Sequence, residues 1–124
     1  MKKRGFLLIV GLLFILTACS RTTLSSVHEG MVFGQQRHTS LARDGSYLTL
    51  TVTRSCSRGD DSVLCNASHA LDYILGELGF EDAVRRRMVE TRALDGRQTA
   101  ENDNFRASWT FHPDDGLQIL FENN

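Results

Sequence analysis

The side chains whose chemistry depends most on their surroundings are three cysteines, Cys19, Cys56 and Cys65. A cysteine thiol can carry a lipid, form a structural disulfide, ligate a metal or take part in redox exchange. The compartment and the neighbouring residues decide between these roles. The first eighteen residues of the chain indicate the compartment.

The start of the chain has the form of a secretory signal peptide. Lys2, Lys3 and Arg4 are followed by an apolar run, Phe6–Leu16, and then by small residues. A basic segment, a short apolar segment and small residues before a cleavage point are typical of such signals. The run has 11 residues, whereas a helix needs about 20 to span a bilayer. Residues 1–18 are therefore predicted to be a removed leader, not a transmembrane helix.

The end of this leader, Leu16-Thr17-Ala18-Cys19, resembles the lipobox of bacterial lipoproteins. The resemblance implies cleavage before Cys19, a diacylglycerol thioether on its sulfur and a further acyl chain, such as palmitate, on its new amino group. Two or more chains anchor a protein stably in a membrane. Ser20 stands where the family's inner-membrane retention signal has an aspartate, which implies the outer membrane of a Gram-negative cell, facing the periplasm. The alternative is an ordinary secretory signal with a chance cysteine.

Cys56 and Cys65 remain once Cys19 carries lipid. In the oxidising periplasm such a pair is expected to form a disulfide. Eight residues separate the two cysteines, a spacing that suits neither a C-x-x-C redox motif nor a metal site, which are the rival interpretations. Closing a loop of this size stabilises the fold by about 2.7 kcal/mol on a chain-entropy estimate.

The predicted disulfide loop contains Arg58-Gly59-Asp60, followed by Asp61. The tripeptide is that of integrin ligands, but three residues often match by chance, and Gly-Asp-Asp-Ser is ordinary turn sequence. A polar, disulfide-closed loop is also what an inhibitory protein would present. Arg58, Asp60 and Asp61 are therefore candidate partner-binding residues.

Motifs for catalysis, cofactors or metals are not found elsewhere in the sequence. The four histidines are His28, His38, His69 and His112. None of them stands in an H-x-x-x-H or H-E-x-x-H motif, the spacings typical of metal sites and metalloproteases. No G-x-S-x-G nucleophile motif occurs, and a paired-acid hydrolase needs separated carboxylates that face one cleft. We therefore expect a protein that is not an enzyme and that has neither cofactor nor metal.

After the leader, Arg85-Arg86-Arg87 is the one run of three successive residues of like charge. Three successive residues cannot share one face of a helix or strand, so we expect a solvated surface balanced by nearby acidic residues more than a patch for lipid headgroups or an acidic partner. The leader takes three of the 14 basic residues, which leaves 11 basic and 15 acidic residues and a formal charge of −4. This balance argues against nucleic-acid binding.

Residues 20–30 are polar and rich in serine and threonine, and they are predicted to be a tether. In Tyr47–Arg54 apolar residues alternate with threonines, which is typical of a half-buried strand. Asp44-Gly45 is a strong signal for a two-residue hairpin turn. Pairing across this turn places Leu41 opposite Leu48 on the apolar face.

The clearest helix is predicted over residues 66–78. Asn66 is a good N-cap, apolar residues repeat at intervals of three and four, and Gly79 supplies the stop. Residues 81–94 are ambiguous, and we predict a short helix or turn followed by a strand near Met88–Leu94. Residues 95–104 are predicted to be a polar loop.

The C-terminal region predicts a second hairpin. Apolar residues alternate in Phe105–His112 and again after the turn sequence Pro113-Asp114-Asp115-Gly116. The two apolar faces agree only if Phe111 lies opposite Leu117, because a slip of one residue would turn one strand inside out. The turn region then has five residues, or three if the residues at its two ends also pair.

These elements predict an α+β domain, a small antiparallel sheet of about four or five strands with one main amphipathic helix. The chain would consist of a leader (1–18), a lipidated tether (19–30) and a single periplasmic domain (31–124). The length that remains after the leader is enough for one small domain.

The leading hypothesis is a non-enzymatic outer-membrane lipoprotein that binds a protein of an envelope or secretion assembly. Small α+β pilotins of secretin channels look similar in size and outline, a resemblance of format and not of motif. The binding surface would be an exposed apolar strip or a groove between helix and sheet. One alternative is an inhibitor, immunity or exclusion lipoprotein that blocks a hydrolase, toxin or plasmid. The other is a small envelope enzyme.

Overall fold

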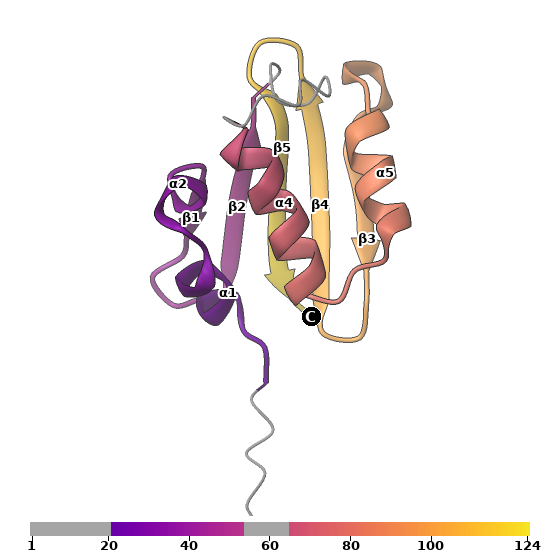
Figure 1. The fold of residues 1–124 in the computed structure, drawn as a ribbon. Coiled ribbons are helices and arrows are strands. Elements are labelled where there is room, and N and C mark those ends of the chain that lie inside the picture. Colours follow the sequence, from indigo (N-terminus) through magenta and orange to yellow (C-terminus); the bar gives the residue numbers. More distant parts are fainter. Residues whose placement is uncertain (1–20, 54–64) are drawn as a thin grey trace, which may run out of the picture.

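A computed structural model describes residues 21–53 and 65–124 of the chain. They form a five-stranded antiparallel sheet with helices packed on one face (Figure 1). The strands lie side by side in the order β1 (Thr39–Leu41), β2 (Tyr47–Val52), β5 (Gly116–Asn123), β4 (Phe105–His112) and β3 (Gln98–Glu101). The helices are α1 (Leu24–Gly30), α2 (Phe33–Gln36), α4 (Asn66–Glu77), α5 (Asp82–Glu90) and the 3-10 helix η1 (Ala93–Asp95). The predicted α+β fold is confirmed.

The hairpin of β4 and β5 forms in the predicted register. Phe111 lies opposite Leu117, so the apolar residues of both strands face the helices. His112 and Gly116 also pair, which makes the turn three residues long. Gly116 has a φ of +91°, a conformation that costs glycine little because it has no Cβ.

The hairpin of β1 and β2 has the predicted register but a longer turn. Leu41 lies opposite Leu48, as the apolar pattern requires. The Ala42 N–H donates to the Tyr47 carbonyl at 2.9 Å, and residues 43–46 form the turn. The prediction of a two-residue turn was therefore wrong, although the centre of the hairpin lies where it was expected.

The core fills the space between the sheet and α4. This helix begins at Asn66, but Cys65 and not Asn66 occupies the N-cap position. It stops before Gly79, whose φ is +74°. The core side chains of the three central strands and α4 are Leu48, Leu50, Val52, Phe105, Ala107, Trp109, Leu117, Ile119, Phe121, Ala67, Ala70, Leu71, Ile74 and Leu75.

Residues 24–30 are not a tether, contrary to the prediction from their polar composition. They form α1, and both Leu24 and Val27 are buried in the core. The hydroxyl groups that suggested a flexible linker form a capping box: Thr23 Oγ1 accepts from the Ser26 N–H at 3.1 Å, and Ser26 Oγ accepts from the Thr23 N–H at 3.0 Å. Such reciprocal bonds satisfy N–H groups that a helix start leaves without partners.

The end of α1 packs tightly against α4. A Cβ at Gly30 would collide with the Tyr73 hydroxyl, so a larger residue here would displace the Tyr73 side chain. The Gln36 side-chain amide donates to the His28 carbonyl at 3.0 Å and joins α2 to α1. The folded domain therefore includes residues from about 21 onward, ten earlier than predicted, and only residues 20–23 separate Cys19 from the first helix.

The predicted strand near Met88–Leu94 is also wrong. Residues up to Glu90 belong to α5, where Met88 is buried, and Leu94 in η1 is 97 % exposed. The alternating residues that suggested a strand do not form one buried and one exposed face. Conversely Gln98–Glu101, predicted as loop, form the edge strand β3 against β4. An edge strand needs few apolar residues of its own.

Among the described helices, none combines the length and the apolar character that crossing a bilayer requires.

Candidate functional site

Most residues predicted to form a site lie outside the described part of the chain: Cys19, Cys56, Arg58, Asp60 and Asp61. Cys65 is described, buried at the start of α4, and disulfide-bonded. Its partner lies outside the described residues, so the specific Cys56–Cys65 pairing stays a prediction.

The domain has two unlike ends. β2 ends and α4 begins beside the β4–β5 turn, and we call this the distal end (Figure 1). Arg21 and the β3–β4 turn lie at the opposite end, which we call the basal end (Figure 1). Thr53 and Cys65, the described residues on either side of the sequence that contains Arg58, Asp60 and Asp61, therefore lie at the distal end, away from Arg21.

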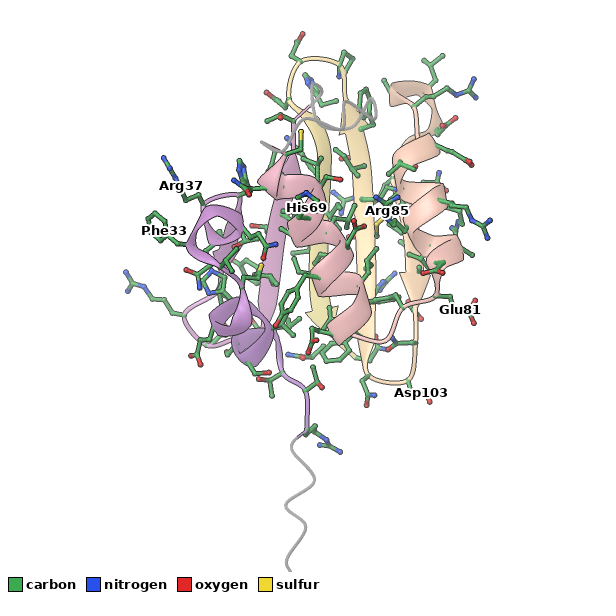
Figure 2. All side chains as sticks on the ribbon, in the orientation of Figure 1. Phe33, Arg37, His69, Glu81, Arg85 and Asp103 are labelled. Atoms are coloured by element: carbon green, nitrogen blue, oxygen red, sulfur yellow. The ribbon has the colours of Figure 1, made fainter. Side chains whose placement is uncertain are left out.

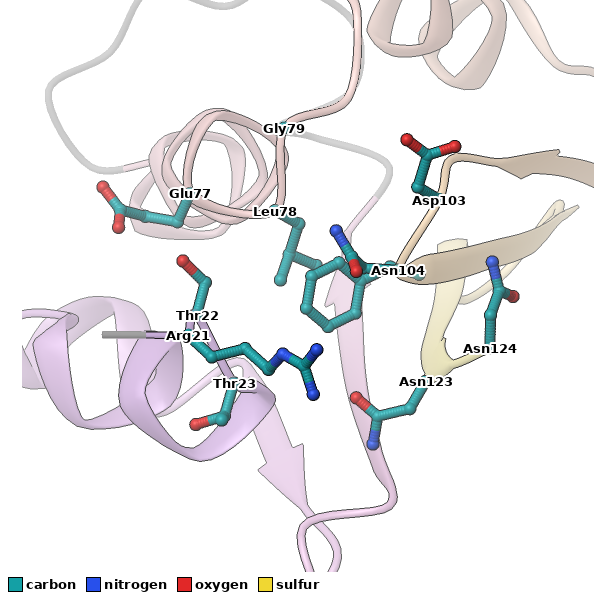
Figure 3. Close-up of a pocket in the computed structure, with 11 residues that line it drawn as sticks. Arg21, Thr22, Thr23, Glu77, Leu78, Gly79, Asp103, Asn104, Asn123 and Asn124 are labelled. Atoms are coloured by element: carbon teal, nitrogen blue, oxygen red, sulfur yellow. The ribbon is translucent and has the colours of Figure 1, made fainter. Parts of the chain in front are cut away.

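A cavity of about 620 Å³ opens at the basal end (Figure 3). Its walls come from the segment before α1, the end of α4, the β3–β4 turn and the end of β5. The lining side chains, with Gly79, are Arg21, Thr22, Thr23, Glu77, Leu78, Asp103, Asn104, Phe105, Asn123 and Asn124. We call this the basal cavity. Its hydroxyl, amide and charged groups suit a polar ligand.

Asn102 joins the walls of the basal cavity. Its Nδ2 donates to the Leu78 carbonyl at the end of α4 (2.9 Å), and its Oδ1 accepts from the N–H groups of Asn104 (3.1 Å) and Phe105 (2.9 Å). Asn124 Nδ2 donates to the Asn102 carbonyl at 2.6 Å. Asn102 was not predicted from the sequence, because one asparagine in a polar stretch has no signal that distinguishes it from ordinary loop sequence.

The charged side chains of the basal cavity have no partners among the described residues. Glu77 and Asp103 supply two carboxylates and Arg21 supplies one guanidinium. Within residues 21–53 and 65–124, none of these three side chains forms an ion pair or a hydrogen bond. Together they carry a formal charge of −1, and their hydrogen-bonding groups are available to a ligand.

The side chains of Arg85, Arg86 and Arg87 point in different directions, because successive residues of a helix lie on different faces. Arg85 pairs with Asp72 of α4, and the hydrogen bond from Arg85 to this carboxylate raises the pKa of the guanidinium. The Arg87 guanidinium lies 5.3 Å from the Trp109 ring centroid and donates to the Thr99 carbonyl at 3.1 Å. Arg86 is exposed. Arg85 and Arg87 therefore join α5 to α4, β4 and β3, and the three arginines do not form a single basic patch.

Two exposed carboxylates have lowered pKa values because neighbouring groups donate hydrogen bonds to them. Asp44 accepts from the Ser46 hydroxyl (2.6 Å) and N–H (3.0 Å) in the β1–β2 turn. Asp95 accepts from the Arg92 N–H (2.7 Å) and side chain in η1. A lowered pKa means that these contacts stabilise the turns above the ordinary carboxylate pKa and are lost as the pH falls through the lowered value.

Trp109 is buried, and its one polar atom donates a hydrogen bond to Thr91, the C-cap residue of α5. The Nε1–H donates to Thr91 Oγ1 at 2.8 Å, and the Thr91 hydroxyl donates to the Arg87 carbonyl at 2.6 Å. The Thr91 hydroxyl is both donor and acceptor, so the Trp109 indole nitrogen and the Thr91 oxygen are both hydrogen-bonded. Thr91 was missed as a structural residue because it lay in the segment predicted as a strand.

Replacing Thr91 with valine is expected to lower the free energy of unfolding by about 1–3 kcal/mol, because the indole N–H loses its acceptor while remaining buried. Urea unfolding followed by the fluorescence of Trp109, the one tryptophan of the chain, measures the effect. Thr91→Ser keeps the hydroxyl and is the matched control. A valine variant as stable as the serine variant would contradict the role given to this hydrogen bond.

An apolar surface lies on the side of the domain at α2. Val32 and Phe33 are adjacent and are 63 % and 78 % exposed. The Arg37 guanidinium lies 6.0 Å from the Phe33 ring centroid, and both side chains point away from the domain (Figure 2). We call Val32, Phe33 and Arg37 the α2 flank. No periodicity marks these residues in the sequence, and only their exposure identifies them.

The histidines do not gather into a metal site in the described part of the chain. His69 lies exposed on the outer face of α4 (Figure 2), and His112 lies 3.3 Å from Asp115 in the β4–β5 turn. Over residues 21–53 and 65–124, no three His, Cys, Asp or Glu side chains are grouped to hold a metal ion.

Comparison with protein-family models, with curated proteins and with solved structures finds no match to this chain. The basal cavity and the α2 flank are therefore interpreted from their own chemistry.

Proposed function

We propose that this chain is a lipoprotein anchored in the outer membrane and facing the periplasm, where it acts as a non-enzymatic accessory factor of an envelope or secretion assembly. It binds a protein component of that assembly through the α2 flank. The observation that carries the proposal is the exposure of Phe33, 78 % of whose surface is open to solvent.

The α2 flank has the composition of a protein-binding hot spot. Single exposed apolar residues are common on protein surfaces, but here an aromatic ring adjoins an aliphatic side chain and an arginine lies over its face. Aromatic residues and arginine are enriched at interfaces and dominate their binding energy. A partner with an apolar pocket would cover Phe33 and pair with the nearby charge of Arg37.

The short connection to the proposed anchor restricts the partner. Five residue steps separate Cys19 from Leu24, where α1 begins, and they span at most about 18 Å when fully extended. A domain held so closely can contact only components that lie in the membrane or next to it. This favours a membrane-embedded assembly over a freely diffusing enzyme or toxin.

Crosslinking in intact envelopes tests the proposal. Phe33→Ser is expected to reduce the recovery of a defined oligomeric envelope component at least about tenfold, because truncating a central aromatic residue typically costs 2 kcal/mol or more of binding energy. Leu94→Ser is the matched control, because Leu94 is also an exposed apolar residue but lies in η1, which contacts β4, whereas α2 contacts the edge strand β1.

The same experiment separates the accessory factor from an inhibitor. If the double change Asp60→Ala and Asp61→Ala leaves recovery intact while Phe33→Ser abolishes it, the accessory function is supported. If the changes at Asp60 and Asp61 abolish recovery and Phe33→Ser does not, the proposal fails and an inhibitory function of the predicted Cys56–Cys65 loop is favoured.

A further inference from the structure

We propose that the basal cavity binds the zwitterionic headgroup of a membrane phospholipid, one that carries a phosphate and a primary ammonium group. Arg21 and Asn104 would hold the phosphate and the Asp103 carboxylate would hold the ammonium, while Glu77 on the opposite wall adds a second negative charge. This inference rests on the anchor proposed at Cys19, and it adds a second, non-covalent contact between the domain and the bilayer.

The anchor places the basal cavity at the level of the headgroups. Arg21 follows Cys19 by two residues, so at most about 7 Å of extended chain separates them. The polar layer on each side of the hydrocarbon core is about 5–8 Å thick. Acyl chains on Cys19 would therefore hold Arg21, and with it one wall of the cavity, inside or next to this layer.

The size and shape of the basal cavity suit a small charged group. Its volume of about 620 Å³ lies within the usual range for small-molecule sites. Arg21 extends across the cavity toward Asn123, while Asp103 and Asn104 approach from the β3–β4 turn (Figure 3). In this view Arg21 and Asn104 lie near each other, and the Glu77 and Asp103 carboxylates lie on opposite sides of the cavity, on α4 and on the β3–β4 turn (Figure 3).

The phosphate side of the cavity is formed by Arg21. A guanidinium binds phosphate through parallel, charge-assisted hydrogen bonds, and Arg21 has no ion-pair partner in the described segments that would compete. The side-chain amide of Asn104 adds an N–H donor at the same cavity, and it makes no hydrogen bond within the described residues. The Arg21 guanidinium would attract a phosphodiester by its charge, and both groups would orient it through directional hydrogen bonds.

The ammonium side is formed by carboxylates. Asp103 and Glu77 line the cavity, and Asn123 adds an acceptor because its Nδ2 is turned toward the carbonyls of Gly45 (3.4 Å) and Ser46 (3.5 Å). With two carboxylates against one guanidinium, a purely anionic ligand meets net repulsion. A ligand with both charges satisfies both sides, and this is the observation that selects a zwitterionic headgroup.

Soluble headgroups test the site without a bilayer. The lipidated chain in maltoside micelles, which contain neither phosphate nor amine, is titrated with glycerophosphoethanolamine, glycerophosphoglycerol or ethanolamine and followed by ¹H–¹⁵N NMR. Saturable shifts are expected at the Asn104 side-chain amide and the Gly79 N–H. The half-saturation concentration for glycerophosphoethanolamine is expected to be at least about tenfold lower than for the other two compounds.

Paired variants locate the two charges. Arg21→Gln and Asp103→Asn are each expected to raise the half-saturation concentration for glycerophosphoethanolamine at least about tenfold. Arg86→Gln and Asp114→Asn make the same chemical changes at exposed positions away from the cavity and are expected to have no effect. Equal affinity for glycerophosphoglycerol, or an unchanged affinity in Arg21→Gln, would overturn the proposal.

Nanodiscs then distinguish a membrane lipid from a soluble phosphodiester. The same signals are expected to shift in phosphatidylethanolamine nanodiscs and not in phosphatidylglycerol nanodiscs, and no shift in either would overturn the assignment to the membrane. Mass spectrometry of the anchor and crosslinking through Phe33 are separate measurements. Failure of the headgroup site is therefore distinguishable from failure of the proposed function.

Discussion

Replacing Leu24 with alanine is expected to lower the free energy of unfolding by about 2–5 kcal/mol, the range for truncating a buried leucine. Leu24 is 0 % exposed and packs in the core with Val27, although it lies only five residues after Cys19. A domain of this size has a total stability of about 5–15 kcal/mol. The loss would therefore remove a large share of the stability of the fold.

Glu29→Ala is the matched control for Leu24→Ala, because Glu29 lies on the exposed side of the same helix and is expected to change stability by no more than about 0.5 kcal/mol. Urea unfolding of the mature chain, followed by Trp109 fluorescence, measures both variants. If residues 24–30 were a tether, the two changes would be equally harmless. Equal stabilities would thus contradict the position of α1 in the core.

Replacing Cys19 with serine is expected to abolish lipidation and with it the retention of the protein in the membrane fraction. The thioether needs the cysteine sulfur, and no other cysteine follows the small residues at the end of the leader. Since stable anchoring requires two or more acyl chains, the loss is expected to be all or none. Intact-mass spectrometry and envelope fractionation measure it.

The double variant Cys56→Ser with Cys65→Ser is the control for Cys19→Ser. It is expected to keep the acyl chains and the membrane retention, while its free energy of unfolding falls by about 2–5 kcal/mol through loss of a disulfide. An acylated, membrane-bound Cys19→Ser protein would show that the anchor lies elsewhere. The proposed compartment and the proposed headgroup site would then both lose their support, because both depend on lipidation at Cys19.

Local patterns predicted the two hairpins and α4 because each depends on residues that are close in sequence. Leu41 opposite Leu48 and Phe111 opposite Leu117 follow from alternation on either side of a turn. The apolar repeat of α4 likewise selects one face of one helix. In these cases the periodicity and the buried face agree.

The segments predicted wrongly are those whose burial depends on distant partners. α1 has only Leu24 and Val27 as buried residues, too few for a recognisable period, and they are buried only because the sheet and α4 lie beside them. β3 forms because β4 offers it a partner. The alternation at Val89 and Thr91 suggested a strand, but here helix α5 places Met88 and not Val89 toward the core.

The sequence by itself determined the fold class and the registers of the two hairpins, because these depend on neighbours or on fixed periods of two and 3.6 residues. The leader and the anchor also follow from local sequence, and they stay predictions. Only the tertiary structure placed α1 in the core, exposed Phe33 and assembled the basal cavity. That cavity joins Arg21, Glu77, Asp103 and Asn123, which are separated by up to about a hundred residues of chain. No local pattern relates such residues, because they meet only when the strands pair and the helices pack on one face of the sheet.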